Sequence, residues 1–588
     1  MQPVDYTTLI AACAELRRDW IPARTEQVYQ RDRYTIALAL RTLKKREWLT
    51  ICWHAQAARI CLGDPPPRTP DTFTFSDQLR HQLNGLALIA IEIVAPWERV
   101  LDLQFGQRPG EEPLWHLYVE IMGKYSNVIL TDANRQIVTA AHQVSPSQSS
   151  VRPIQTGQPY ELPPPLLGTL PKLDESFTSW QERVSLIPGK LKRQLLDSYR
   201  GLSPRIATEI IQAADLEPER ATTSLQQSDW EKLFTYWQKW LKILQTKEFQ
   251  PGWTEEGYTV LGWNMSQSAP NVQSLLNRYY TDELNQQEFK QLLHQLMQKV
   301  TNLLKKLQQK AAIFQKRLQQ SSEAEAYRQQ ADLLMAHLHQ WQPGMTSITL
   351  SDFETNKPIA IKLDPEKNAV QNAQSLYKNH QKLKRAKDAV VPLLEEVESE
   401  IRYLEQLSAT LSQLADYRAH RDCKEQTTRE DLQTLAEIRE ELIEQNYLAD
   451  ARQRSYQVVS NDSKPYCYKT PSGFELWIGR NNRQNDRLTF RVAGDYDLWF
   501  HTQEIPGSHV LLRLEPGTVP NEADLQFSAD LAAYYSQGRE SERVPVVYTE
   551  PKNVYKPKGA KPGMAIYKQE RIIWGRPQLA KNYADVTN

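Results

Sequence analysis

The C-terminal end of the chain carries basic and aromatic side chains in a pattern that suits nucleic-acid binding. Eight basic residues fall between Lys552 and Lys581, and only Glu570 opposes them. Cations neutralise phosphates, and aromatic rings stack on unpaired bases. A solvated basic edge of a β domain is the alternative interpretation. The RNA-contact candidates in this run are Lys552, Lys556, Lys558 and Lys561, and the interleaved aromatic residues are Tyr548, Tyr555, Tyr567 and Trp574.

An amide-rich segment, residues 479–486, lies upstream of this run and is predicted to be a polar loop. Amides offer donors and acceptors together, which suits base or ribose edges. His501 and His509 have no carboxylate or cysteine at ligand spacing, so structural hydrogen bonding or RNA contact is favoured over metal binding or acid-base catalysis. The further RNA-contact candidates are Arg480, Asn481, Asn482, Gln484, Asn485, Asp486, Trp499, His501, Ser508 and His509.

Composition limits the remaining possibilities. The 588 residues include 71 Lys+Arg and 71 Asp+Glu, so the net charge is zero and any nucleic-acid surface must be local. None of the five cysteines forms a CxxC pair, so the sequence gives no zinc-site signal. We expect no metal and no cofactor. The sequence has no run of about 20 apolar residues and no cationic, apolar leader. We therefore expect a cytoplasmic protein without a membrane partner, built from several domains.

The elements that must position these residues begin with an N-terminal α+β region. The spacing of apolar residues predicts a helix over 4–18, strands over 27–41 and 48–54, a helix over 75–86, and strands near 88–105 and 114–131. Residues 195–216 then predict two short helices around Gly201, Leu202, Ser203 and Pro204. This helix-hairpin-helix loop either contacts a nucleic-acid phosphate or only packs, and the sequence leaves both readings open.

Two long helices follow, separated by a strand-like stretch at 346–363. In the second helix Leu376, Leu383, Val390, Val397, Leu404 and Leu411 recur every seven residues, with Leu393 and Leu407 at partner positions. This recurrence is typical of a coiled coil, and Pro392 should kink it. We therefore predict an intramolecular antiparallel arm with a small strand-containing tip. Beyond it, residues 466–479 predict a hairpin and 523–536 a helix.

The chain is thus predicted to be a multidomain α+β protein. We expect an N-terminal domain over 1–172, a helix-hairpin-helix region over 173–275, the arm over 276–450, and a β-rich α+β RNA-binding domain over 451–588. No active site is expected, so the protein is predicted not to be an enzyme.

Long segments of this sequence resemble the NFACT family. IGRNNRQNDRLTFRVAGDYDLWFHTQEIPGSHVLL and DLAAYYSQGRESERVPVVYTEPKNVYKPKGAKPGMAIY are similar to its RNA-binding domain, and EIMGKYSNVIL, which contains Lys124, is similar to its N-terminal domain. The resemblance spans nearly the whole chain in family order. It implies a ribosome quality control factor that binds obstructed large ribosomal subunits carrying peptidyl-tRNA, with contacts to rRNA and a stalk-base protein. The factor would bring in alanine-charged tRNA, so that alanine is added to stalled chains without mRNA while the ribosome does the peptide-bond chemistry.

The resemblance also implies site residues. An Asp-Arg pair that recruits tRNA in the family matches Glu98 and Arg99 here, with glutamate in place of aspartate, and Asp5 matches another acidic position. These residues and Lys124 are the tRNA-contact candidates. An exposed ion pair is the alternative for Glu98 and Arg99. Two other functions stay open, a large-subunit sensor without tailing and a fibronectin-binding surface adhesin.

The N-terminal domain further resembles the fold of formamidopyrimidine-type DNA glycosylases. Those enzymes need a proline that becomes N-terminal after methionine removal, and many carry a zinc finger. Position 2 here is Gln2, Pro3 is displaced, and no zinc spacing exists, so we expect no glycosylase activity.

Overall fold

The computed structural model describes residues 1–67, 70–149, 151–164, 168–321, 323–353, 355–419, 425–449 and 463–580. It divides into two compact units, unit 1 (residues 1–285) and unit 2 (residues 286–588). Long helices and two larger β-sheets confirm the multidomain α+β class. No helix among the described residues is long and apolar enough to span a membrane.

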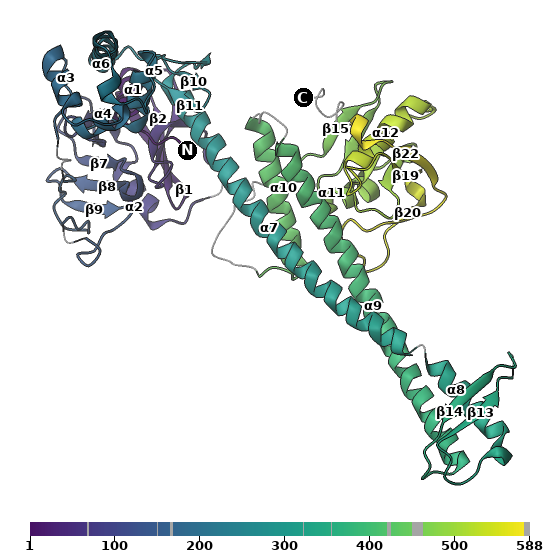
Figure 1. Ribbon diagram of the computed structural model, residues 1–588. Helices are drawn as coiled ribbons and strands as arrows, with labels where there is room; N and C mark the ends of the chain where they lie inside the picture. The colour runs from purple at the N-terminus through teal and green to yellow at the C-terminus, as the bar shows by residue number, and fades with distance from the viewer. Residues whose placement is uncertain are drawn as a thin grey trace. The chain divides into compact units, whose positions relative to one another are not determined.

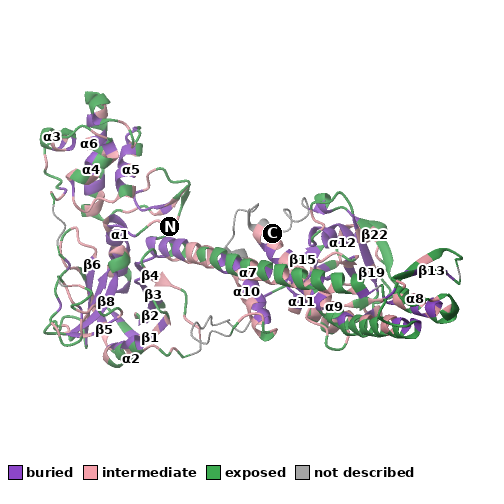
Figure 2. Ribbon diagram, turned by 60° about the horizontal axis from the view of Figure 1, so that its bottom comes forward, coloured by how far each residue is buried: buried purple, intermediate pink, exposed green. Residues whose placement is uncertain are grey.

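Unit 1 is built on a nine-stranded antiparallel sheet in the order β4-β3-β2-β1-β5-β6-β7-β8-β9. Helices α1 and α2 pack against it, and their apolar faces join the strands in the largest core cluster (Figure 2). The bounds are α1 Tyr6–Trp20, β1 Ala23–Asp32, β2 Thr35–Arg41, β3 Arg46–Cys52, β4 Arg59–Gly63, α2 Thr74–Leu83, β5 Ala87–Ile93, β6 Val100–Gly106, β7 Trp115–Glu120, β8 Asn127–Asp132 and β9 Ile137–Ala140.

A tryptophan-rich helical layer follows the sheet within unit 1. Trp180, Trp230, Trp237 and Trp240 form the centre of its core, and the Trp240 indole donates to the Thr7 hydroxyl of α1 at 3.0 Å. This bond ties the helical layer to the sheet layer. The elements are α3 Phe177–Ser185, α4 Leu191–Ser198, α5 Pro204–Ala213, α6 Gln227–Thr246, β10 Gly252–Thr254, β11 Gly257–Thr259 and β12 Gln267–Ser268.

Helix α7 (Val272–Ser321) starts in unit 1 and continues into unit 2. In unit 2 the chain forms α8 (Ala324–Ala336) and the hairpin of β13 (Ser347–Ser351) and β14 (Pro358–Lys362), and returns along α9 (Ala369–Ala419) to α10 (Glu425–Glu444) (Figure 1). Phe289 and Leu296 of α7, Leu404 and Leu411 of α9, and Ile438 of α10 share one apolar cluster.

The six-stranded antiparallel sheet of the C-terminal domain has the order β15-β16-β18-β17-β19-β22. Helix α12 packs on one face of it, and a two-stranded ribbon of β20 and β21 packs on the other. The bounds are β15 Tyr466–Lys469, β16 Glu475–Ile478, α11 Asn482–Arg487, β17 Leu498–Thr502, β18 Val510–Leu512, α12 Glu522–Tyr534, β19 Val544–Thr549, β20 Val554–Tyr555, β21 Ile566–Tyr567 and β22 Arg571–Gly575.

Several local predictions are wrong. The stretch 27–41 is a hairpin rather than one strand, because Asp32 accepts a hydrogen bond from the backbone of Tyr34 and the chain reverses there. The polar segment 479–486 contains helix α11, started by the side chain of Asn481, which caps the Gln484 amide. Leu393, expected at a partner position of the coiled coil, is 43% exposed rather than buried.

The long-helix predictions fare better. Val397, Leu404 and Leu411 are buried. Helix α9 is 51 residues long and runs through Pro392 without interruption. The coiled coil itself, the bend at Pro392 and the four domain boundaries stay predictions.

Candidate nucleic-acid interface

Asp5 lies where the sheet layer and the helical layer of unit 1 meet. Its side chain caps α1 by accepting a hydrogen bond from the Thr8 amide at 2.8 Å. Its second carboxylate oxygen accepts the Ser203 hydroxyl at 2.7 Å, and Ser203 in turn caps α5. One carboxylate therefore joins the starts of two helices that are 198 residues apart in sequence.

Glu98 and Arg200 form a second link across the same junction. Their side chains are ion-paired and only 15% and 12% exposed. Trp97, the residue before Glu98, packs between Tyr6 and Trp240 with ring-centroid distances of 4.8 and 5.5 Å. The helix-hairpin-helix loop thus packs on the segment 97–99, which supports the packing interpretation of that loop.

Arg99 completes this cluster, whereas Lys124 does not join it. The Arg99 guanidinium donates to the Val4 carbonyl at 3.2 Å. Burial lowers the pKa of Arg99 and the nearby Asp5 carboxylate opposes that effect, so the guanidinium stays charged. Lys124 is exposed, with its ammonium 4.9 Å from the centre of the exposed Tyr125 ring. We call Asp5, Glu98, Arg99, Arg200 and Ser203 the junction cluster.

Gly201 makes the close approach at this junction possible. Its φ is +81°, and a Cβ there would lie 2.7 Å from Trp97 Cε3. Gly201→Ala is therefore expected to lower the free energy of unfolding by about 2–4 kcal/mol, combining backbone strain with the clash. Gly157→Ala is the matched control, because its φ is +83° with nothing within 4 Å of the added Cβ. Thermal unfolding should show a clearly larger loss at Gly201, and equal losses would contradict the contact with Trp97.

Glu209 is a buried carboxyl group on α5, next to the junction cluster. It is 2% exposed, accepts from Arg205 Nε at 2.9 Å, and accepts the Thr259 hydroxyl at 2.9 Å. Burial raises the pKa of Glu209 to about 7, and the bonds from Thr259 and Arg205 only partly offset that rise. The carboxyl group therefore titrates within the physiological pH range.

This raised pKa predicts a pH-dependent stability. Between pH of about 4.5 and 7 the folded chain holds a proton that the unfolded chain releases, so stability falls as pH rises through this window and then levels off. Glu209→Gln removes the titration. The free energy of unfolding of this variant, relative to that of the wild type, should rise by up to about 3 kcal/mol as the pH increases from 4.5 to 8. Urea unfolding at both pH values measures the gain, and a constant difference between the two proteins would exclude the raised pKa.

The amide-rich segment lies against α10 rather than in solvent. Asn481 Nδ2 donates to Glu437 at 2.6 Å, and Asn482 Nδ2 donates to Glu441 at 3.0 Å. Gln484 donates to the Ser463 carbonyl at 2.6 Å. The amides that were predicted to contact RNA are therefore buried and form hydrogen bonds within unit 2. Their contact with RNA stays a prediction.

Arg480 is the central side chain of this contact. It is 5% exposed, lies 3.4 Å from both Glu430 and Asp431, and covers the Tyr466 ring at 4.1 Å from its centre. The carboxylates that receive the segment follow helical spacing along α10, a signal that the sequence reasoning missed. These residues are Glu430, Asp431, Glu437, Glu440, Glu441 and Glu444.

Both histidines lie inside the C-terminal domain. Burial lowers the pKa of His501 to about 4 and that of His509 to about 3, so neither is cationic at neutral pH. His509 and the Trp499 indole share the Thr489 hydroxyl, at 2.7 and 3.0 Å. Asn485 accepts from the His509 amide at 3.1 Å, and Ser508 is 7% exposed. These contacts fit the structural hydrogen-bonding role.

The four candidate lysines divide into two kinds. Lys561 points inward, with its ammonium 4.4 and 5.0 Å from the ring centres of Tyr447 and Tyr403, and burial lowers its pKa. Lys556 is ion-paired with Asp486. Lys552, Lys556 and Lys558 are all exposed, and Lys552 is ion-paired with Glu550. Lys581 lies outside the described residues.

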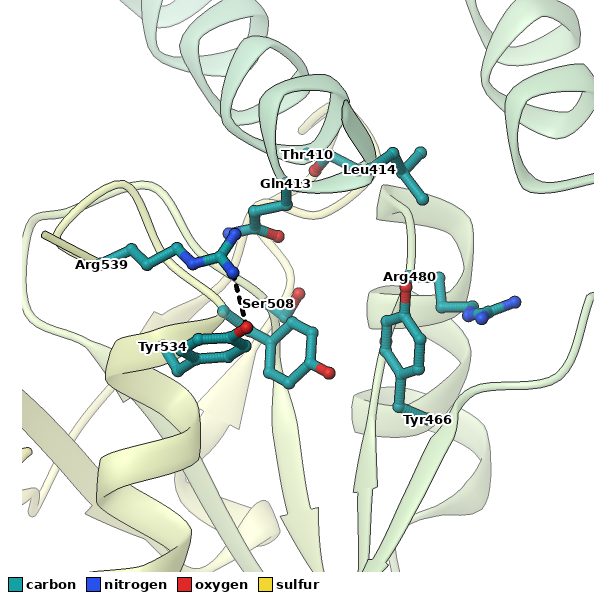
Figure 3. Close-up of a pocket in the computed structure, with 10 residues that line it drawn as sticks. Thr410, Gln413, Leu414, Tyr466, Arg480, Ser508, Tyr534 and Arg539 are labelled. Carbon is teal, nitrogen blue, oxygen red and sulfur yellow. Dashed lines mark hydrogen bonds between the residues drawn. The ribbon is translucent and has the colours of Figure 1, made fainter. Parts of the chain in front are cut away.

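A small pocket opens between α9 and the C-terminal sheet (Figure 3). Thr410, Gln413 and Leu414 line it from α9, and Tyr466, Arg480, Ser508, Tyr534 and Arg539 line it from the domain. Arg539 donates to the Tyr534 hydroxyl at 2.5 Å and lies over that ring. Because its arginines already bond within the protein, the pocket is part of the packing between α9 and the domain. Within the described ranges no three His, Cys, Asp or Glu side chains gather as they would around a metal ion.

Comparison with known proteins covers nearly the whole chain. Residues 5–458 match the family model of the NFACT N-terminal and middle domains, and residues 464–568 match that of the NFACT protein RNA binding domain. The Rqc2 homolog RqcH of Streptococcus suis is 31% identical over 571 residues, covering 95% of both chains. That of Bacillus subtilis is 29% identical over 581 residues, covering 96% of both. The solved C-terminal part of the fibronectin/fibrinogen-binding protein from Streptococcus suis is 30% identical and covers 50% of this chain and 98% of its own, with a TM-score of 0.38.

Proposed function

The chain belongs to the NFACT family, and on that premise we propose that it is a ribosome-associated quality control factor. The observation that carries this proposal is the similarity to proteins named Rqc2 homolog RqcH over 95–96% of the chain. The match of residues 464–568 to an RNA-binding domain supports the proposal, because a factor that acts on ribosomes is expected to bind RNA. The protein works in the cytoplasm on large subunits that are obstructed by peptidyl-tRNA.

In this role the protein positions substrates and the ribosome does the chemistry. Unit 1 takes alanine-charged tRNA, with Glu98, Arg99, Asp5 and Lys124 as the residues on which that step depends. Holding a charged tRNA beside the stalled chain supplies the proximity that turns an encounter into an ordered reaction. The C-terminal domain holds rRNA, and the tip of unit 2 reaches a stalk-base protein.

The junction cluster holds the two layers of unit 1 together, so they can present one continuous surface to a tRNA. The Asp5–Ser203 bond and the Glu98–Arg200 ion pair tie the helix-hairpin-helix to the sheet layer. For a tRNA that contacts both layers, a fixed arrangement of the two lowers the free-energy cost of ordering them on binding. Arg99 keeps its charge beside this junction and supplies a cation for the tRNA backbone.

Co-sedimentation tests the proposed function. Purified protein is mixed with intact ribosomes, free large subunits and large subunits that carry peptidyl-tRNA, and the bound tRNA is sequenced. We expect the protein to sediment with the obstructed subunits and alanine tRNA to be enriched with it. Equal binding to all three particles, or a random tRNA population, would contradict the proposal.

A second candidate is a large-subunit sensor without tailing activity. The observation that favours it is that Glu98 is already ion-paired with Arg200 inside unit 1. A sensor would bind obstructed subunits and leave the length of the stalled peptide unchanged, so the mass of that peptide separates the two functions.

A further inference from the structure

The edge strand β22 presents apolar side chains to solvent on one face of the C-terminal sheet. Ile573 packs into the core that α12 covers. Ile572 and Trp574 alternate with it and therefore point to the opposite face, where they are 54% and 55% exposed. A strand edge with two large exposed apolar side chains is a surface that a partner is expected to cover.

The ribbon of β20 and β21 covers the neighbouring part of that face. Val554 and Tyr567 are paired across the ribbon, and both pack on Trp499 in a cluster with Val547 of β19. Their chain neighbours Tyr555 and Ile566 form the other cross-strand pair and point outward, 48% and 53% exposed. The ribbon thus has one face fixed to the sheet and one face free.

The two exposed pairs belong to one surface. Val547 of β19 packs under the ribbon, and Ile572 is its cross-strand partner on β22. The exposed side chains of β22 therefore lie directly beside the ribbon, on the same face of the sheet. Figure 1 shows β19, β20 and β22 together on this side of the domain. We call this surface, formed by Tyr555, Ile566, Ile572 and Trp574, the edge platform.

Cations with no carboxylate partner accompany the edge platform. Lys568 lies with its ammonium 5.6 Å from the centre of the Tyr555 ring, and Arg571 starts β22. Lys558, Lys568 and Arg571 are exposed, and within the described part of the chain none of them is ion-paired. Lys552, Lys556, Lys561 and Arg576 are instead ion-paired with carboxylates.

We infer that the edge platform binds unpaired RNA, with bases stacked on Tyr555 and Trp574 and phosphates held by Lys568 and Arg571. Exposed rings recognise the face of any base, and unneutralised cations beside them match the phosphates that link stacked bases. An apolar protein strand added to β22 would leave these cations without counter-charges. The inference rests on the proposed function. It specifies the RNA that this domain binds as an unpaired loop of rRNA rather than a duplex.

Fluorescence anisotropy with the full chain and a labelled short oligouridylate tests this inference. Trp574→Ala and Tyr555→Ala should each weaken binding about 5- to 100-fold, since one stacked base is lost. Trp574→Phe and Tyr555→Phe should restore most of the affinity. Lys568→Gln and Arg571→Gln should each reduce the slope of log affinity against log salt by about 0.7. Phe353→Ala is the control, because this aromatic residue is 62% exposed outside the domain and should change nothing.

Two results would overturn the inference. One is unchanged affinity in both alanine variants, and the other is equal affinity for a duplex of the same length. Co-sedimentation with obstructed subunits separates this failure from failure of the proposed function. If the wild type binds those subunits while the alanine variants keep full oligouridylate affinity, only the edge platform is wrong. If the wild type binds oligouridylate through the platform yet ignores the subunits, the ribosomal role is wrong.

Discussion

Arg480→Ala is expected to weaken the packing of helix α11 on α10 and to lower the free energy of unfolding of this part of unit 2 by about 3–5 kcal/mol. The guanidinium is buried between Glu430, Asp431 and the Tyr466 ring. Its removal leaves the carboxylate of Asp431, which is 1% exposed, without this counter-charge in a medium of low polarity. The substitution also removes the contact of the guanidinium with the Tyr466 ring. Arg480→Lys would not restore this contact, because lysine lacks the planar group.

Hydrogen exchange read by mass spectrometry measures this effect in the full chain. Amides of α11 and β16 should exchange about 100-fold faster or more in the variant, and amides of unit 1 should not change. Arg328→Ala is the control, because Arg328 is 58% exposed and pairs with Glu325 and Asp332 at 3.8 Å on α8. Exposed pairs contribute about 0–1 kcal/mol. Equal protection of α11 in both variants would show that Arg480 does not hold the two helices together.

The second large effect is expected at Glu98. Glu98→Ala leaves Arg200, only 12% exposed, without its carboxylate and removes one of the links between the layers of unit 1. We expect the tRNA that co-purifies with the protein to fall at least tenfold, because the helix-hairpin-helix is held less firmly against the sheet layer. Quantitative sequencing of bound tRNA measures the loss, and Glu98→Gln should lose almost as much because it keeps the shape without the charge.

A charge reversal separates a positioning role from direct contact with tRNA. Glu98→Arg combined with Arg200→Glu restores the ion pair with opposite polarity, so tRNA binding should recover if the pair acts by holding the loop. If Glu98 itself touches tRNA, the double variant should bind as poorly as each single variant. Glu98→Asp keeps the charge but reaches one methylene less far, so it should give an intermediate result.

The sequence predicted the elements better than the environment of individual polar residues. Apolar periodicity is a local signal, so α1, α2, α12 and the hairpin of β15 and β16 could be predicted from spacing alone. The hairpin within 27–41 was missed because alternation continues on both sides of a two-residue turn. Leu393 fits the apolar pattern but is 43% exposed, whereas Val390 and Val397 of the same helix are buried.

The amide-rich segment shows why candidate sites are harder to predict. Asn481 and Asn482 suit RNA edges and protein carboxylates equally well, and only tertiary structure places α10 against them. The same holds for Lys561, whose aromatic partners Tyr403 and Tyr447 are more than 100 residues away in the chain. By contrast, Tyr555 and Trp574 were candidates from the basic and aromatic run, and the structure leaves both exposed.

The mass of the stalled peptide tests the central claim most directly. Large subunits that carry a defined peptidyl-tRNA are incubated with the purified protein and alanine-charged tRNA in the absence of mRNA, and the peptide is released and weighed. A quality control factor that delivers tRNA predicts peptides heavier by whole alanine residues, fewer with Glu98→Ala and none without the protein. A peptide of unchanged mass on subunits to which the protein is bound would contradict tRNA delivery.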